Sequence, residues 1–118
     1  MKVMRFGAAE TYEPDKDWKR VSLCCEEDIS VEHFAKPPGH ASPMHGHPSA
    51  QVLVVLKGKL AIITDEDGEE VLDEGDAVYI PGNQSHIVKN PLDVVCVGID
   101  IFVPGRSFDF WLKRKAGQ

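Results

Sequence analysis

The chain has 118 residues, enough for one compact domain with its own core and too few for two. Hydrophobic residues make up 42% and charged residues 27%, a balance that is typical of folded globular proteins and excludes disorder as the main state. Lys and Arg number 13 against 19 Asp and Glu, and the net charge of −6 repels nucleic-acid phosphates. No apolar run approaches the ~20 residues of a membrane helix, and the charged N-terminus is unlike a signal peptide. We therefore expect one domain over residues 1–118, cytoplasmic, with no nucleic-acid or membrane partner.

The composition also favours β-structure. Val and Ile together number 20, against 7 Leu. These β-branched side chains fit a pleated surface and are stiff in helices. The 10 Gly and 8 Pro interrupt the chain at short intervals. Short strands with frequent turns predict an all-β sandwich or barrel.

The first 20 residues predict an N-terminal arm with one short strand that packs on a partner subunit. Strands are expected at residues 21–25, 29–36, 50–57, 59–64, 69–73, 77–80, 86–89 and 93–103. Tight turns are expected at residues 65–68 and 81–83. Pro104 and Gly105 end the sheet, and residues 106–115 form either a short helix or a strand that folds back.

The strand expected at residues 50–57 is apolar on both faces over residues 52–56. A sheet with one wet face would alternate hydrophobic and polar side chains. Both faces must therefore be covered, one by the barrel interior and the other by a second sheet or another subunit. This pattern predicts a homodimer.

Three histidines and one glutamine form a candidate metal site. His45 and His47 share a face in extended chain, about 7 Å apart, and Gln51 has the same parity. His86 begins a later strand. Three imidazoles and an amide oxygen suit one divalent transition-metal ion, whether Mn, Fe, Co, Ni, Cu or Zn. The alternative for His-x-His alone is a pair of polar loop histidines.

The spacing of these residues extends over two segments. They are Gly39, His45, His47, Gln51 and Gly58 in residues 39–58, and Gly75, Pro81, Asn83, His86 and Asn90 in residues 75–90. Both segments resemble the two sequence motifs of the cupin superfamily. The resemblance spans about residues 30–103 and implies a double-stranded β-helix (jelly-roll) barrel with a metal inside.

Two positions depart from the family pattern. The family usually has Gly where this chain has Asn83, but Asn tolerates a left-handed backbone and can keep the turn. It usually has Glu where this chain has Gln51, so the site loses one negative charge. A divalent ion would then be a stronger Lewis acid and would stabilise a trivalent state less, which favours polarisation of a carbonyl or hydroxyl over oxygenase chemistry. His40 matches no motif position, and we interpret it as an exposed or supporting residue.

A second signal lies in the last predicted strand, where Asp100 is the single charge inside an apolar run. A buried carboxylate is costly unless it is paired or functional. Arg106 follows closely and could reach it. Asp100 is therefore either half of a buried Asp–Arg pair or an acid/base beside the metal.

Asp100, Phe102 and Arg106, within Asp-Ile-Phe-Val-Pro-Gly-Arg, resemble the terminal strand of small cupins with three His and one Gln. These include the uronate-linearising enzymes of pectin and alginate breakdown, although residues 106–112 differ from what is typical of them. The resemblance implies that Asp100 and Arg106 line the site with the metal. It also implies conversion of unsaturated cyclic monouronates to open-chain keto forms.

Three functional hypotheses follow. The first is a metal-dependent enzyme that isomerises, lyses or rearranges a small polar carboxylated metabolite, with Asp100 as acid/base and Arg106 binding the substrate anion. The second is a non-enzymatic cupin that binds or senses a small ligand. The third is a dioxygenase that acts on a thiol or a diketone.

Overall fold

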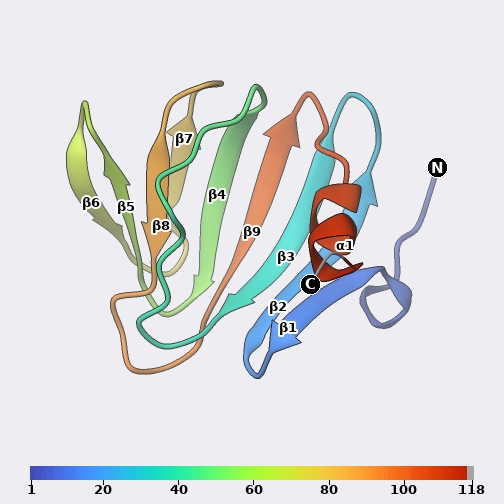
Figure 1. Cartoon of the computed structure of the whole chain (residues 1–118), viewed down its shortest axis with the longest axis horizontal. Coiled ribbons are helices and arrows are strands. Elements are labelled where there is room, and N and C mark those ends of the chain that lie inside the picture. The colour runs from blue at the N-terminus through green and yellow to red at the C-terminus, as the bar shows by residue number, and fades with distance from the viewer. Residues whose placement is uncertain (117–118) are drawn as a thin grey trace.

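A computed structural model describes residues 1–116, with side chains through Leu112. The described chain folds into two antiparallel sheets, of order β1-β2-β3-β9-β4-β7 and β6-β5-β8 (Figure 1). The strands are β1 (Thr11–Asp15), β2 (Trp18–Cys25), β3 (Ser30–Lys36), β4 (Ala50–Lys57), β5 (Leu60–Thr64), β6 (Gly68–Leu72), β7 (Ala77–Ile80), β8 (His86–Lys89) and β9 (Cys96–Val103). A 3-10 helix η1 (Phe6–Ala8) precedes them and a helix α1 (Asp109–Ala116) follows.

The predicted all-β fold is confirmed, and most of the expected strands lie within two residues of the observed ones. The last strand begins later than expected, at Cys96, and the segment after Pro104 and Gly105 is a helix rather than a returning strand. The N-terminal arm contains the short strand expected of it, and its packing on a partner subunit stays a prediction. Its strand β1 pairs with β2 of the same chain, because β2 extends back to Trp18 and offers an edge there.

Strand β9 lies between β3 and β4, and this placement builds the interior. Alternate residues of all three strands are buried, which is the period-2 pattern of side chains that face a core. The register places Glu32 opposite Asp100, and Asp100 opposite Leu53. One end of the inner face is therefore polar. The other end joins a hydrophobic core that includes Phe34, Leu53, Val55, Leu60, Ile62, Ile80, Val88 and Cys96.

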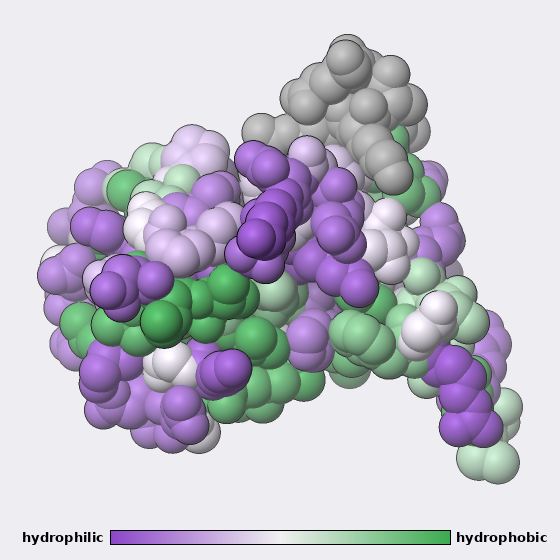
Figure 2. Space-filling model, turned by 90° about the horizontal axis from the view of Figure 1, so that it is seen from below, coloured by the Kyte–Doolittle hydropathy of each residue, from purple (hydrophilic) through white to green (hydrophobic). Residues whose placement is uncertain are grey.

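The outer face of β4 is less covered than its inner face. Val52 and Val54 are half-buried, and Leu56 is 45% exposed in the single chain. Figure 2 shows that hydrophobic residues also gather in a band on the underside of the molecule. The homodimer stays a prediction. Among the described residues, no helix has the length and apolar character needed to cross a membrane.

Asn90 connects the loops at one end of the barrel through its side-chain hydrogen bonds. Its side chain is fully buried, and its amide nitrogen donates to the backbone carbonyls of Lys36, Pro37 and Val94 at 3.0, 3.0 and 2.8 Å. Its side-chain oxygen accepts the Leu92 N–H at 2.9 Å. Backbone carbonyls buried without a donor are costly, so one amide satisfies groups from two separate loops.

We expect Asn90→Ala to lower the free energy of unfolding by about 2–4 kcal/mol, because it leaves these buried groups without partners. Urea denaturation followed by circular dichroism measures the change. Asn83→Gly is the matched control, since Asn83 has φ 67°, which glycine adopts freely, and it should stay within about 1 kcal/mol of the wild type. An Asn90→Ala protein as stable as this control would contradict the assignment.

Candidate metal centre

The two motifs meet at one end of the barrel. His45 and His47 lie in the loop before β4, and His86 is the first residue of β8. His45 and His86 form an isolated antiparallel bridge, and the Asn83 N–H donates to the His47 carbonyl at 2.7 Å. Asn83 has the left-handed backbone that the sequence predicts for it. The turn before β8 is thus tied directly to the His-x-His segment.

Each of the three imidazoles is oriented by a backbone carbonyl. The Nδ1 atoms of His45, His47 and His86 lie 2.8 Å from the carbonyl oxygens of Pro43, Ser49 and Gln84 respectively. A carbonyl can only accept, so Nδ1 carries the proton and the Nε2 lone pair remains free. One ring nitrogen of each histidine lies within 4.8 Å of the other two. The three rings therefore lie close enough together to hold one metal ion.

Gln51 adds a fourth acceptor. Its amide nitrogen donates to Asp100 Oδ1 at 2.7 Å, which leaves Oε1 at 3.0 Å from His47 Nε2. Two acceptors at this distance need a proton or a cation between them. His86 Nε2 is buried and has no hydrogen-bond partner within the described part of the chain. Four acceptors without donors fit a divalent transition-metal ion.

Burial affects the charge of this site. It lowers the pKa of His45 and of His86, while the carbonyls that accept from Nδ1 act in the opposite direction and the neighbouring histidines add to the lowering. A lowered imidazole pKa keeps these rings neutral near pH 7. The lone pairs that a metal needs are then available without the loss of a proton.

Asp100 is buried, but its cationic partner is not the expected one. Its Oδ2 accepts from Arg20 at 2.5 Å, and Arg20 Nε also donates to Glu32 at 2.8 Å. Arg106 instead donates to both oxygens of Glu32, at 3.1 and 3.2 Å. Of the two alternatives for Asp100, the buried Asp100–Arg106 pair is therefore wrong. The reason is the β3–β9 register, which places Glu32 beside Asp100 and lets Arg20 bridge the two carboxylates.

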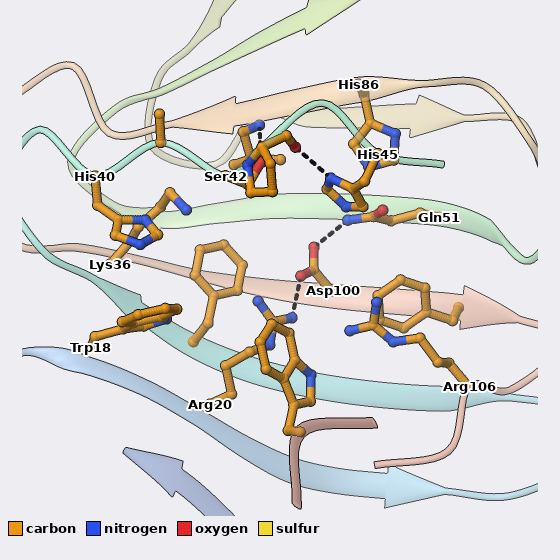
Figure 3. Close-up of a pocket in the computed structure, with 16 residues that line it drawn as sticks. Trp18, Arg20, Lys36, His40, Ser42, His45, Gln51, His86, Asp100 and Arg106 are labelled. Atoms are coloured by element: carbon orange, nitrogen blue, oxygen red, sulfur yellow. Dashed lines mark hydrogen bonds and ion pairs between the residues drawn. The ribbon is translucent and has the colours of Figure 1, made fainter. Parts of the chain in front are cut away.

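The site opens into a cavity of about 230 Å³ (Figure 3). His45, Gln51, His86 and Arg106 line one end of it, and Asp100 lies near its middle. Trp18, Lys36 and His40 line the other end. The structure thus brings the predicted Gln51, Asp100 and Arg106 into the same region as the three histidines.

Four further residues of this region were not predicted as site residues: Arg20, Glu32, Lys36 and His40. A signal for two of them exists in the strand at residues 30–36. Glu32 and Lys36 share the parity of Phe34, and all three are buried. Two charges on the core face of an amphipathic strand indicate a polar cavity. Arg20 carries no such signal, because its position depends on the pairing of β2 with β3.

Comparison with known proteins identifies the family to which this fold belongs. The family model for the cupin domain matches residues 33–102. A curated relative, an uncharacterised protein of Methanocaldococcus jannaschii, is 27% identical over 64 residues, which cover 54% of this chain and 55% of that protein. This chain therefore matches about half the length of that relative.

Solved structures agree. An RmlC-like cupin from Shewanella frigidimarina has a TM-score of 0.80 at 24% identity, covering 93% of this chain and 96% of its own. KdgF from Halomonas sp. has a TM-score of 0.79 at 19% identity, covering 93% and 98%. The polyketide cyclase RemF from Streptomyces resistomycificus has a TM-score of 0.74 at 18% identity, covering 90% and 81%. Since the family model covers more than half of the chain, this protein belongs to the cupin superfamily.

Proposed function

We propose that this cupin is a metal-dependent enzyme that isomerises or rearranges a small polar carboxylated metabolite. One observation carries the proposal. Four acceptor atoms converge without donors at the end of a cavity, and a buried carboxylate that is held by a guanidinium lies beside them. An ion site next to a fixed acid/base group in a concave pocket is the arrangement that proton-transfer chemistry needs.

His45, His47, His86 and Gln51 would hold the ion. A bound divalent ion would supply Lewis-acid polarisation of a substrate oxygen. The carbonyl-fixed tautomers support this ligand set, since no ring has to rotate or lose a proton before it binds the metal. The ion is Mn, Fe, Co, Ni, Cu or Zn, and elemental analysis will identify it.

Asp100 has two roles in this proposal. It holds the Gln51 amide nitrogen, which keeps Gln51 Oε1 turned toward His47. A carboxylate accepts about four hydrogen bonds, so each Asp100 oxygen keeps a lone pair for a substrate proton. Arg106 binds the substrate carboxylate. Glu32 occupies one of its terminal nitrogens, while Arg106 Nε is buried with no hydrogen-bond partner among the described residues.

Unsaturated cyclic monouronates are the substrate class that we propose. The ending Asp-Ile-Phe-Val-Pro-Gly-Arg and the His/Gln set resemble uronate-linearising cupins, and the polar cavity suits a sugar acid. Linearisation is an isomerisation with no net loss of atoms. Asp100 would take the proton of the anomeric hydroxyl as the ring C–O bond breaks, and a proton is returned to the former alkene carbon as the keto form appears.

The metal site can be tested by elemental analysis of the tag-free protein. We expect near-stoichiometric metal in the wild type, at least about tenfold less in His47→Ala, and a smaller loss in Gln51→Ala. His33→Ala is the control, because His33 packs against Phe6 and does not line the cavity. A wild-type protein that contains no metal and takes up none on titration would contradict the proposal and favour a ligand-binding cupin.

The role of Asp100 can be tested with Asp100→Asn. This variant keeps an oxygen for Gln51 but loses the base, so turnover should fall at least about 100-fold while the metal content is retained. The assay follows the ultraviolet absorbance of the conjugated alkene in an unsaturated monouronate. Asp93→Asn, at an exposed position before β9, is the control. Unchanged turnover in Asp100→Asn would remove Asp100 from the chemistry, and joint loss of metal and turnover would limit it to positioning Gln51.

A further inference from the structure

The end of the cavity farthest from Arg106 contains a second group of polar side chains. Lys36, His40 and Trp18 gather there (Figure 3). Lys36 is the last residue of β3 and lies four residues beyond Glu32 on the same face. Their Cα atoms are about 13 Å apart at the usual rise of a strand. The cavity therefore has two separate polar ends.

The positive side chains in and beside the cavity outnumber the negative ones. Arg20 and Arg106 are matched by Glu32 and Asp100 through three ion pairs, so this cluster of four is neutral. Lys36 adds one positive charge. Its side chain belongs to a residue only 8% exposed, and it makes no hydrogen bond or ion pair with any described residue. An ammonium group that faces a cavity from a largely buried residue, with no carboxylate paired to it, attracts an anion.

His40 supplies an independent sign of a missing ligand. Its Nδ1 is buried and has no hydrogen-bond partner in the part of the chain that the structure describes. The ring is held against Trp18, with centroids 4.5 Å apart. Two neighbouring residues at the same end of one cavity thus offer groups to a ligand, Lys36 a cation and His40 a buried ring nitrogen without a partner.

We propose that Lys36 and His40 form an anion-binding subsite for a carboxylate or phosphate group at the end of the ligand that lies away from the metal-ligand set. This inference rests on the proposed function only in that the ligand occupies the same cavity. It narrows the ligand to one with a second anionic group, a phosphate or a further carboxylate, beyond the carboxylate that contacts Arg106. An unsubstituted monouronate lacks this second group. The subsite also assigns Lys36 a role in selecting ligands of the right length.

The ionisation of Lys36 is consistent with such a subsite. Burial and, to a smaller extent, the positive charge of Arg20 lower its pKa, Asp100 opposes both, and the result is a pKa of about 8. The other titratable groups around it are Cys96, His40 and His45. A bound anion would favour the ammonium form, so anion affinity should fall as the pH rises through about 8.

The subsite can be tested by anion titration at constant ionic strength. Trp18 and Trp111, the 2 tryptophans of the chain, both line the cavity, so their fluorescence reports its occupancy. Glutarate and inorganic phosphate are the probes, and they distinguish a carboxylate source from a phosphate source. We expect saturable binding of at least one probe, weakened at least about tenfold in Lys36→Met and restored in part by Lys36→Arg.

The controls separate this subsite from the metal centre and from general charge effects. Lys57→Met removes an exposed lysine at the end of β4 and should bind like the wild type. His47→Ala should keep probe binding, and Lys36→Met in that background should lose it. Failure of the metal-enzyme proposal would appear in metal content and turnover and leave these titrations unchanged. Equal affinities in Lys36→Met and Lys57→Met, or no saturable binding of either probe to any of the proteins, would overturn the subsite.

Stability gives a second test that needs no ligand. The folded pKa of Lys36 is about 8 against a usual 10.5, so below about pH 8 the fold carries the full cost of a buried ammonium group. This cost disappears as the pH rises from about 8 to 10.5, where the unfolded chain binds more protons. Lys36→Met should therefore melt at a higher temperature than the wild type near neutral pH, and the difference should shrink toward pH 10. A lower melting temperature for Lys36→Met than for Lys57→Met at neutral pH would show that Lys36 has a stabilising partner.

Discussion

Two carboxylates lie side by side inside this barrel because the β3–β9 register pairs Glu32 with Asp100. They would repel each other in a poorly hydrated interior unless cations compensated them. Arg20 forms an ion pair with each carboxylate, and Arg106 forms a second ion pair with Glu32. The cluster fixes Asp100 as an acceptor for the Gln51 amide nitrogen. The direction of the Gln51 oxygen, and with it the fourth acceptor of the candidate metal centre, depends on this pairing.

Such a cluster of buried charges contributes little net stability to the fold. Replacement of buried ion pairs by hydrophobic residues is often neutral or stabilising, whereas loss of one partner leaves a buried charge. The neighbouring hydrophobic core shows that the same sheet can bury a hydrophobic face where no polar site is formed. The polar half of the inner face is therefore best explained by what it holds in place, namely Gln51 on one side and Arg106 on the other.

Period-2 patterning and turn residues were enough to predict most strands, because they are local properties of the sequence. Motif spacing likewise led to His45, His47 and His86, which the fold brings together. The partner of Asp100 was predicted wrongly, because Arg20 lies 80 residues away and reaches it through two strand pairings. Lys36 was overlooked for a different reason. Its strand is predictable from local pattern, but the motif spacing carries no information about the two charges on the buried face of that strand.

The substitution of Gln51 for the usual glutamate can now be weighed with its surroundings. A neutral amide removes one negative charge from the ligand set, yet Asp100 places a carboxylate directly behind that amide. Arg20 in turn neutralises Asp100, so the ion would gain little compensation from it. Lys36 adds further positive charge at the other end of the cavity. The cavity thus carries a net positive charge, which supports the proposed anionic substrate and, for a bound metal, the proposed Lewis-acid role over stabilisation of a higher oxidation state.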